Sequence, residues 1–573
     1  MAILDPRSSI LSRRWSVGLL AILALTFWTR FYQIKDLALP AWVDSVHHAL
    51  MIRVAAERGQ APYSLYPYLP VDQLPYHWGY HVFAAALMRL SGMPLGETML
   101  WAGQVLNALQ ALAVAALAAF LWRRPFAGVV AGLVVGLLSI MPAYYVSWGR
   151  YTQLTGLLLL PPLMIAWRAG LHAPSRGRFV CVAVLLAGLS LIHFRIQVFA
   201  LAFMAVSGAI WAFEAGWVRL RSRFWYATGA AALALALAAP WLWVIAVRTL
   251  LPAVARPQNL VAEAGYSGLT AGLLWAGHNR WLIALALAAA LWGLLRRSRV
   301  AAEQVGWVAV LALLANPALV GLPYTWLITN DVVVISLFIP VGVVLGGGAS
   351  MLVAWLESRL GTAGGTTDKQ TSRQGDLARS TSPVSLSRGL LVSQAVGGRW
   401  SVVGRWWPFV RGAVVIVIGA LALWGAWDMR SVINPDTVLA TQADVAAIAW
   451  ADANTPADAR FLVNAAPWLN IQRGADGGWW LLPLAGRWVS APPILYIYGP
   501  LDYAREIGEL NKSIVGFRQG QEQQIYDLID RERITYIYLG ARPGPLSAAV
   551  FASSGAYEKV YQHDGVTILA VHR

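Results

Sequence analysis

Long apolar runs separated by short polar loops dominate the first three quarters of the chain. Runs of about 17 to 25 predominantly apolar residues are long enough to cross a bilayer as helices. The pattern predicts about eleven such spans, near residues 15–33, 97–121, 126–146, 154–167, 179–194, 196–217, 226–248, 281–295, 305–321, 332–355 and 408–427. We therefore expect a polytopic α-helical membrane protein.

Arginine clusters occupy every second loop between these runs. Lys and Arg residues close to the ends of spans are retained on the cytoplasmic side. This alternation predicts a cytoplasmic N-terminus and places the loop 35–96 outside the membrane. The clusters are Arg7, Arg13 and Arg14 before the first run, Arg123 and Arg124 after the second, Arg168, Arg176 and Arg178 after the fourth, Arg219, Arg221 and Arg223 after the sixth, and Arg296, Arg297 and Arg299 after the eighth.

Two segments of the loop 35–96 have helical patterns without being comfortable spans. Residues 76–90 read YHWGYHVFAAALMRL, which is short and polar at its start. Counting this segment as a span would put Arg123 and Arg124 outside, so we expect an amphipathic helix on the outer surface. Residues 43–58 have a similar pattern, and we expect the same of them.

The pattern changes after the transmembrane core, residues 1–356. Residues 357–407 are rich in Gly, Ser, Thr and Arg and lack apolar periodicity, which predicts a flexible cytoplasmic linker. A last transmembrane helix at 408–427 then leads to residues 428–573, an expected extracytoplasmic α/β domain. Its predicted elements are the helix DVAAIAWADAN, the strand RFLVNA, the helix EQQIYDLIDRERI, the strand TYIYLG and the hairpin YEKVYQHDGVTILAV turning at Asp564-Gly565.

Composition supports a membrane protein and removes one alternative. The chain of 573 residues is 58% hydrophobic and 13% charged, and its mean hydropathy is +0.56. The net charge of +16 could indicate nucleic acid as a partner, but residues 428–573 hold 12 Lys and Arg against 15 Asp and Glu. The basic excess therefore lies between the spans, where it reflects topology, and we expect membrane lipids but no nucleic acid as partners. Cys181 is the only cysteine, so no intrachain disulfide can form.

Acidic residues are scarce in the membrane part, and this scarcity selects Asp44. The predicted topology leaves seven of them at the outer face: Asp36, Asp44, Glu57, Asp72, Glu97, Glu263 and Asp331. Asp44 follows the first span on an expected helix, and His47 and His48 come three and four residues later, so all three can share one helix face. We interpret Asp44 as a catalytic general base. The alternative is a carboxylate that caps this helix.

Four of the nine histidines lie in the same outer loop, which suggests ligand contacts. His77 and His81 are four residues apart, and together with His47, His48 and Asp72 they favour binding of a substrate or its phosphate. A divalent cation of the zinc or manganese kind is a second possibility, with Asp44, His48, His77 and His81 as candidate ligands. The spacing matches no specific metal signature, and a simple position at the headgroup level explains these histidines as well.

Two arginines stand at the outer ends of spans, against the general trend of the basic loops. Arg150 with Tyr151 and Arg195 with His193 are candidates for binding a lipid-borne phosphate, because a guanidinium group matches phosphate oxygens in a bidentate way. A structural ion pair is the alternative. Asp331 opens the tenth run, and either it caps that helix or it reaches the active site.

Several of these features together resemble the GT-C superfamily of membrane glycosyltransferases. They are an outer loop that opens with Trp42-Val43-Asp44, a helix that ends at Leu90-Ser91-Gly92 and a second span that closes on Arg123-Arg124, with weaker likeness at 147–153 and 193–195. The protein is most similar to prokaryotic members related to the protein mannosyltransferase and aminoarabinose transferase branches. Two differences are a single acid followed by Ser45, where an acid pair is frequent, and the absence of a WWDYG-type signature.

The resemblance implies transfer of a sugar from a polyprenyl-phosphate donor to a lipid, glycan or protein acceptor on the outer side of the cell membrane. Asp44 corresponds to the loop acid of that superfamily, and Arg195 or Arg150 would hold the leaving phosphate. An inverting single displacement needs only one base of this kind. The alternative functions are a transporter or flippase for lipid-linked saccharides, which would favour repeat symmetry and charges in mid-span, and a non-catalytic assembly factor.

Overall fold

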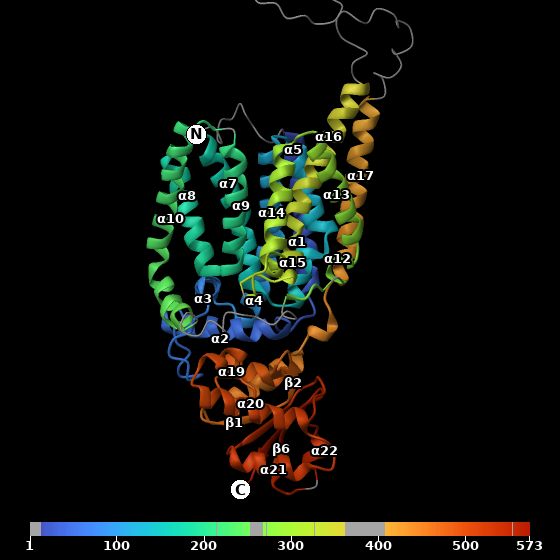
Figure 1. The fold of residues 1–573 in the computed structure, drawn as a ribbon. Coiled ribbons are helices and arrows are strands. Elements are labelled where there is room, and N and C mark those ends of the chain that lie inside the picture. Colours follow the sequence, from blue (N-terminus) through green and yellow to red (C-terminus); the bar gives the residue numbers. More distant parts are fainter. Residues whose placement is uncertain are drawn as a thin grey trace, which may run out of the picture.

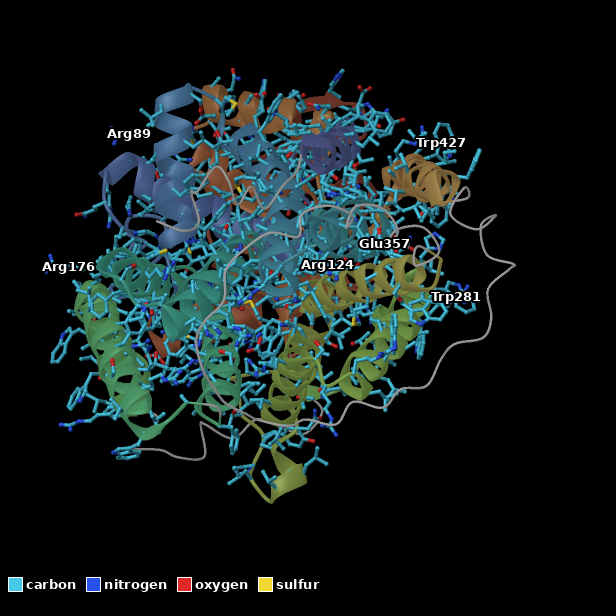
Figure 2. The ribbon with its side chains drawn as sticks, turned by 90° about the horizontal axis from the view of Figure 1, so that it is seen from above. Arg89, Arg124, Arg176, Trp281, Glu357 and Trp427 are labelled. Atoms are coloured by element: carbon cyan, nitrogen blue, oxygen red, sulfur yellow. The ribbon has the colours of Figure 1, made fainter. Side chains whose placement is uncertain are left out.

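The computed structural model describes residues 13–213, 215–252, 267–270, 272–325, 327–360, 407–552 and 554–572. A bundle of long helices stands on one side of helix α2 (Trp42–Arg58), and a smaller region that contains the strands lies on the other side (Figure 1). Viewed along the bundle, Arg89, Arg176 and Trp427 project from its periphery (Figure 2). The chain is therefore a multi-pass α-helical membrane protein with a C-terminal α/β region.

A helix covers each of the predicted apolar runs. The helices are α1 (Arg13–Gln33), α4 (Leu95–Trp122), α5 (Pro125–Leu133), α7 (Tyr151–His172), α8 (Arg176–Ile192), α9 (Phe194–Ala212), α10 (Trp217–Ile245), α13 (Asn279–Leu295), α14 (Arg299–Ala315), α15 (Asn330–Ser336), α16 (Phe338–Leu360) and α17 (Trp407–Asp428). By length and composition, seven helical segments of the described residues are candidate spans, and a bent pair makes an eighth. Helices α8, α13 and α14 have 17 residues each, so the count of eleven spans stays a prediction.

The bent pair begins with α5 and directs the chain toward α2. Helix α5 continues through a π-helical turn (Val134–Leu138), and the path then bends by 61° into α6 (Ile140–Ala143) and a 3-10 turn (Tyr144–Ser147). Buried Arg30 donates from Nη2 to the carbonyl of Gly136 at 2.8 Å and from Nε to Asn107 Oδ1 at 2.7 Å. Asn107 in turn donates to the carbonyl of Pro142 at 2.8 Å. These bonds satisfy backbone groups that the bend removes from regular helix.

Contacts at the opposite end of the bundle hold its helices together. Arg168, near the end of α7, forms an ion pair of 2.6 Å with Glu303 of α14, whose side chain is fully buried. Gly346 of α16 packs against the carbonyl of Ala127 so closely that a Cβ atom there would collide with it. A small residue thus permits close helix contact, as is usual between membrane helices.

The C-terminal region forms a five-stranded sheet with helices around it. The strand order is β4-β1-β5-β7-β6, in which β4, β1 and β5 are parallel and β7 and β6 are antiparallel; β2 and β3 form a separate hairpin. The predicted helices, strands and terminal hairpin of this region are confirmed. The elements are α18 (Gln442–Asn454), β1 (Arg460–Val463), β2 (Ala465–Trp468), β3 (Ile471–Gly474), α19 (Leu481–Ala485), β4 (Trp488–Val489), α20 (Leu501–Gly516), α21 (Glu522–Arg531), β5 (Tyr536–Leu539), α22 (Ala548–Phe551), β6 (Tyr557–His563) and β7 (Val566–Val571).

The two helices expected in the outer loop are present, but one differs from the prediction. Helix α3 (Gly79–Ser91) exposes Phe83 and Leu90, as a helix at a membrane surface would. Helix α2 is covered on both sides, and eleven of its 17 residues are buried. The expectation of a surface helix at 43–58 was therefore wrong, because the C-terminal region packs on the side that the sequence pattern leaves open. Of the predicted linker 357–407, residues 361–406 lie outside the described residues.

Candidate active site

Asp44 lies in the first turn of α2, close to Arg150, which lies between the bent segment and the start of α7. Its Oδ2 atom is 3.9 Å from Arg150 Nε, and the two side chains are 33% and 35% exposed. Burial by the surrounding groups raises the pKa of the Asp44 carboxyl, whereas the charges of Arg150 and Arg195 lower it. The structure therefore brings together the acid and the two arginines that the sequence selected. It leaves the carboxylate accessible beside cationic charge.

Gly149 fixes the approach of the Arg150 segment to α2. Its φ of +63° lies in the left-handed region, and a Cβ atom there would collide with Ser45 Oγ and lie 2.9 Å from the carbonyl oxygen of Ala41. Only glycine meets both requirements without strain. Arg150 follows directly, with its guanidinium carbon 5.0 Å from the ring of Trp148. A single residue thus sets the distance between the acid and its cation.

Arg195 enters the site from the junction between α8 and α9. It lies in the first turn of α9, with its guanidinium carbon 5.5 Å from the ring of Phe194. His193, two residues before Arg195, is buried, and its ring centroid is 4.9 Å from that of His77. Burial, and then the charge of Arg195, lower the pKa of His193, so this imidazole is neutral at pH 7. His193 therefore adds a hydrogen-bonding group beside the cation, but no charge.

The remaining histidines form a buried aromatic wall. His48 Nδ1 and His81 Nε2 are 2.8 Å apart, and burial lowers the pKa of both imidazoles. One neutral ring therefore donates an N–H hydrogen bond to the unprotonated nitrogen of the other. The ring of Tyr76 stacks on that of His77 at 4.2 Å. Tyr151 also belongs to this wall, because its ring stacks on Tyr80 with centroids 5.4 Å apart.

The four candidate metal ligands do not form one coordination group. Among the described residues, no set of three or more His, Cys, Asp or Glu side chains is arranged to hold a metal ion. His48 and His81 bond to each other, His77 faces His193, and Asp44 faces Arg150. The spacing of four residues between His77 and His81 predicts shared ligands, but these two side chains have different neighbours.

Of three other predicted site residues, two bond to other parts of the chain and one is exposed to solvent. His47 accepts a hydrogen bond at Nε2 from the backbone N–H of Ile494 at 3.0 Å, and burial lowers the pKa of this imidazole to about 3. Asp331 accepts two bonds of 3.1 Å from Thr270, one from its N–H and one from its hydroxyl. The side chain of Asp72 is exposed. The structure does not bring these three to Asp44.

The sequence pattern gave no sign of contacts from the C-terminal region. The guanidinium carbon of Arg473 lies 4.6 Å from the ring of Trp42, two residues before Asp44. The ring of Trp479 meets His47 edge-on at 5.8 Å. Both residues belong to a region that the pattern places in a separate unit. No local signal in a sequence reveals which of its residues face another part of the chain.

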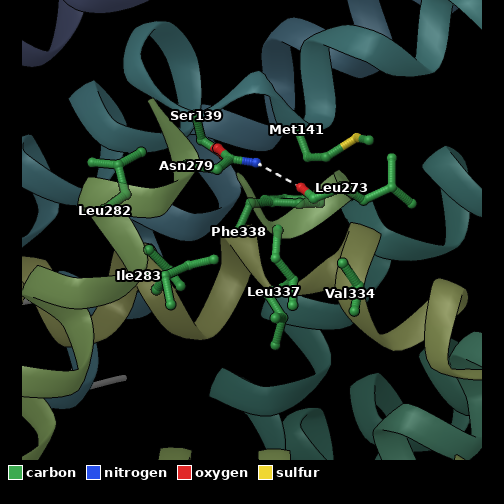
Figure 3. A pocket seen from close by; sticks show the side chains of 11 residues that line it. Ser139, Met141, Leu273, Asn279, Leu282, Ile283, Val334, Leu337 and Phe338 are labelled. Atoms are coloured by element: carbon green, nitrogen blue, oxygen red, sulfur yellow. Dashed lines mark hydrogen bonds between the residues drawn. The ribbon is translucent and has the colours of Figure 1, made fainter. Parts of the chain in front are cut away.

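Two cavities adjoin the bent segment. The larger, with about 310 Å³ of empty space, lies where the helix bends and is mostly apolar (Figure 3). Its polar lining comes from Ser139 and Asn279, whose Nδ2 atom is 3.4 Å from the carbonyl of Leu273. The smaller, with about 190 Å³, is lined by Arg150 and Tyr151 together with Tyr145 and Gln104. Only the smaller cavity contacts the candidate site.

Comparison with known proteins assigns the fold. Neither a protein-family model nor a curated protein matches the sequence. Among solved structures, apo ArnT from Cupriavidus metallidurans superposes with a TM-score of 0.55 at 12% identity over 97% of each chain. The same protein bound to undecaprenyl phosphate gives a TM-score of 0.52 at 11% identity over 98% of each chain.

A second similar structure is the arabinofuranosyltransferase AftD from mycobacteria. It superposes with a TM-score of 0.53 at 16% identity and covers 99% of this chain. The match spans 40% of AftD, so this chain corresponds to less than half of that protein. The chain therefore shares its fold with ArnT and with part of AftD, which is the fold that the resemblance to the GT-C superfamily predicted.

Proposed function

We propose that the protein is an integral membrane glycosyltransferase that moves a sugar from a polyprenyl-phosphate donor to an acceptor on the outer face of the membrane. The observation that carries the proposal is the meeting of Asp44 with Arg150 and Arg195 at one end of the bundle. A base and two cations are the groups that such a transfer requires. The shared fold with two glycosyltransferases, ArnT and AftD, supports the same reaction class.

The proposed reaction is a single displacement. Asp44 accepts the proton of an acceptor hydroxyl, and that oxygen attacks the anomeric carbon of the donor sugar. The bond between the anomeric carbon and the phosphate oxygen breaks, and the polyprenyl phosphate leaves with the electron pair. Attack opposite to the leaving group inverts the anomeric configuration. The charges of Arg150 and Arg195 stabilise the negative charge that develops on the phosphate.

The separation between Asp44 and Arg150 suits this role. A distance of 3.9 Å exceeds that of a direct hydrogen bond. The carboxylate therefore keeps lone pairs for an acceptor hydroxyl, and the guanidinium keeps donors for phosphate. Neither side chain is fully buried, so both can be reached by substrates. His193 lies next to Arg195 and adds a neutral donor or acceptor for a phosphate oxygen or a sugar hydroxyl.

The placement of charge along the helices supports an external site. Arg150 and Arg195 lie at one end of α7 and α9, whereas Arg168 and Arg178 lie where α7 ends and α8 begins, at the other. Basic residues near span ends favour the cytoplasm. In this arrangement the core 1–356, with its outer loop 35–96, and the C-terminal region 428–573 share an external face around Asp44.

The cations and one similar structure support the proposed donor class. The structure of ArnT bound to undecaprenyl phosphate supports a polyprenyl phosphate as the carrier. An acceptor has to bring a hydroxyl group to Asp44. A lipid, a glycan or a protein can present a hydroxyl there. Mass spectrometry of envelope glycans and glycolipids from a deletion strain would identify both the sugar and the acceptor.

Replacing Asp44 by Asn tests the proposal directly. The amide cannot accept the proton, so we expect transfer in the complemented deletion strain to fall by about 10²- to 10⁴-fold, with unchanged protein level. Asp36→Asn is the matched control, because Asp36 is 81% exposed and pairs with Lys35 at 3.0 Å. It should restore wild-type glycans. Normal glycans with Asp44→Asn would exclude Asp44 as the base, and accumulation of donor on the inner face would favour a flippase instead.

A further inference from the structure

The first turn of α2, which carries Asp44, is weakly stabilised by its own sequence. Its N-cap residue is Ala41, whose side chain offers no hydrogen bond to the helix. Alanine at this position stabilises a helix less than Ser, Asp or Asn, whose side chains accept a hydrogen bond from the first turn. Trp42 has a φ of +67°, in the left-handed region that is unfavourable for a residue with a side chain. Contacts from outside the helix therefore have to hold this turn.

The C-terminal region supplies such contacts on both sides of Asp44. Two residues before it, the guanidinium of Arg473 lies over the ring of Trp42 at 4.6 Å. Three residues after it, His47 accepts the N–H of Ile494 at 3.0 Å. Asp44 is therefore bracketed by two contacts from β3 and from the turn that begins at Ile494. On the remaining side, Gly149 packs against Ser45.

The environment of Arg473 makes its contact with Trp42 important to both partners. Arg473 is 8% exposed, and its Nε atom has no hydrogen-bond partner, while Nη1 donates to the carbonyl of Gly474 at 2.7 Å. Burial lowers the pKa of Arg473 to about 10, so the group stays charged at neutral pH. The face of a Trp ring stabilises a desolvated cation of this kind. The contact thus stabilises a buried charge and the unusual backbone of Trp42 together.

We propose that Arg473 is a positioning residue for the transfer reaction, which acts by holding Trp42 and so fixing Asp44 at its distance from Arg150. The inference rests on the proposed function of Asp44. It makes the C-terminal region a structural part of the active site rather than an independent binding module. A displacement of about 1 Å in a reacting group can cost two orders of magnitude in rate.

The test compares two arginines that connect α2 to the C-terminal region. In proteoliposomes, transfer is measured while the concentration of donor is varied, and the probe is the polyprenyl-phosphate-sugar fraction of the host membranes. Arg473→Met should lower kcat about tenfold to a hundredfold and leave KM for the donor within about twofold. Arg473→Lys keeps a cation for Trp42 and should recover most of kcat. Arg53→Met is the control, because Arg53 donates to the carbonyl of Pro483 at 3.2 Å, nine residues beyond Asp44.

The possible outcomes separate this inference from the proposed function. If Asp44→Asn abolishes transfer while Arg473→Met keeps the wild-type kcat, Arg473 has no positioning role and the proposed function stands. If Asp44→Asn is active, the proposed function itself fails. A similar loss in Arg473→Met and Arg53→Met, without rescue by Lys, would mean that only general stability is affected, and would overturn the inference. Should Arg473→Met not fold, Trp42→Leu tests the same contact from the other side, with the same expected loss of kcat.

Discussion

Helix α7 has an arginine and a carboxylate partner at each end, and the two pairs are built differently. Arg168 and Glu303 are 2.6 Å apart, with exposures of 13% and 0%. Arg150, which precedes the helix, and Asp44 are 3.9 Å apart, and both are about one-third exposed. In the first pair the two side chains are in direct contact and largely shielded from solvent. The second leaves both groups able to contact a third molecule.

The difference separates a structural from a chemical use of the same residue types. A buried carboxylate needs its partner at close range, because its desolvation is compensated only by a direct contact. A carboxylate that has to take a proton from a substrate cannot be occupied in this way. In the loose pair, burial raises the pKa of Asp44, and the charges of Arg150 and Arg195 counter only part of this rise. Distance and exposure therefore distinguish the two pairs, whereas residue type does not.

The largest effect is expected when the tight pair, Arg168 and Glu303, is disrupted. Glu303→Gln leaves Arg168 as a buried charge without a carboxylate, so we expect a loss of about 3–5 kcal/mol in stability. The activity of each folded molecule should change little, since the pair lies at the far end of α7. Thermal unfolding of purified protein and transfer per folded molecule measure the two effects. Arg176→Gln, at the exposed start of α8, is the control and should change neither.

Arg150→Gln should give the opposite result. Removal of one cation at the leaving phosphate should lower kcat by about 10²- to 10³-fold. Stability should be retained, because the exposed pair contributes about 0–1 kcal/mol. The measurements are those used for Glu303→Gln. Each variant is therefore expected to lose the property, stability or activity, that the other variant keeps. If Arg150→Gln were mainly destabilised, with normal transfer in the folded fraction, the pair with Asp44 would be structural as well.

The sequence predicted the membrane helices and the principal site residues because both depend on local signals. Apolar runs mark the helices, and Asp44, Arg150 and Arg195 stood out as ionisable groups where few occur. The partners of Asp331 and His47 could not be predicted in this way. Thr270 and Ile494 carry no distinguishing side-chain chemistry, and they approach only after the chain has folded.

The covering of α2 was missed for a related reason. The pattern of residues 43–58 is amphipathic, which fits a helix at a membrane surface as well as one buried under another part of the protein. The contact of Arg473 with Trp42 is one of those that cover α2. Nothing near Arg473 in the sequence indicates Trp42 as its partner. Contacts between distant segments depend on the folded arrangement, whereas helix positions depend on neighbouring residues. The catalytic role of Asp44 and the phosphate role of the arginines stay predictions until the variants are measured.

The smallest expected effect concerns pH and tests the loose pair most finely. Asp44 must be ionised to accept a proton, so the rate is lost as pH falls through its pKa. The charge of Arg150 lowers that pKa. In the residual activity of Arg150→Gln the pKa is therefore higher, and the acid limb of the rate profile moves to higher pH. Arg195→Gln should move it in the same direction by less, because its charge is the weaker of the two influences.

Lys35→Gln provides the control for this measurement, because Lys35 pairs with exposed Asp36, whereas the charges that lower the pKa of Asp44 are those of Arg150 and Arg195. Its acid limb should coincide with that of the wild type. A limb that shifts equally in all three variants would reflect the net charge of the surface rather than the pair. A limb that moves to lower pH in Arg150→Gln would mean that the titrating base is not Asp44. The direction of the shift thus distinguishes a carboxylate beside Arg150 from any other base in the site.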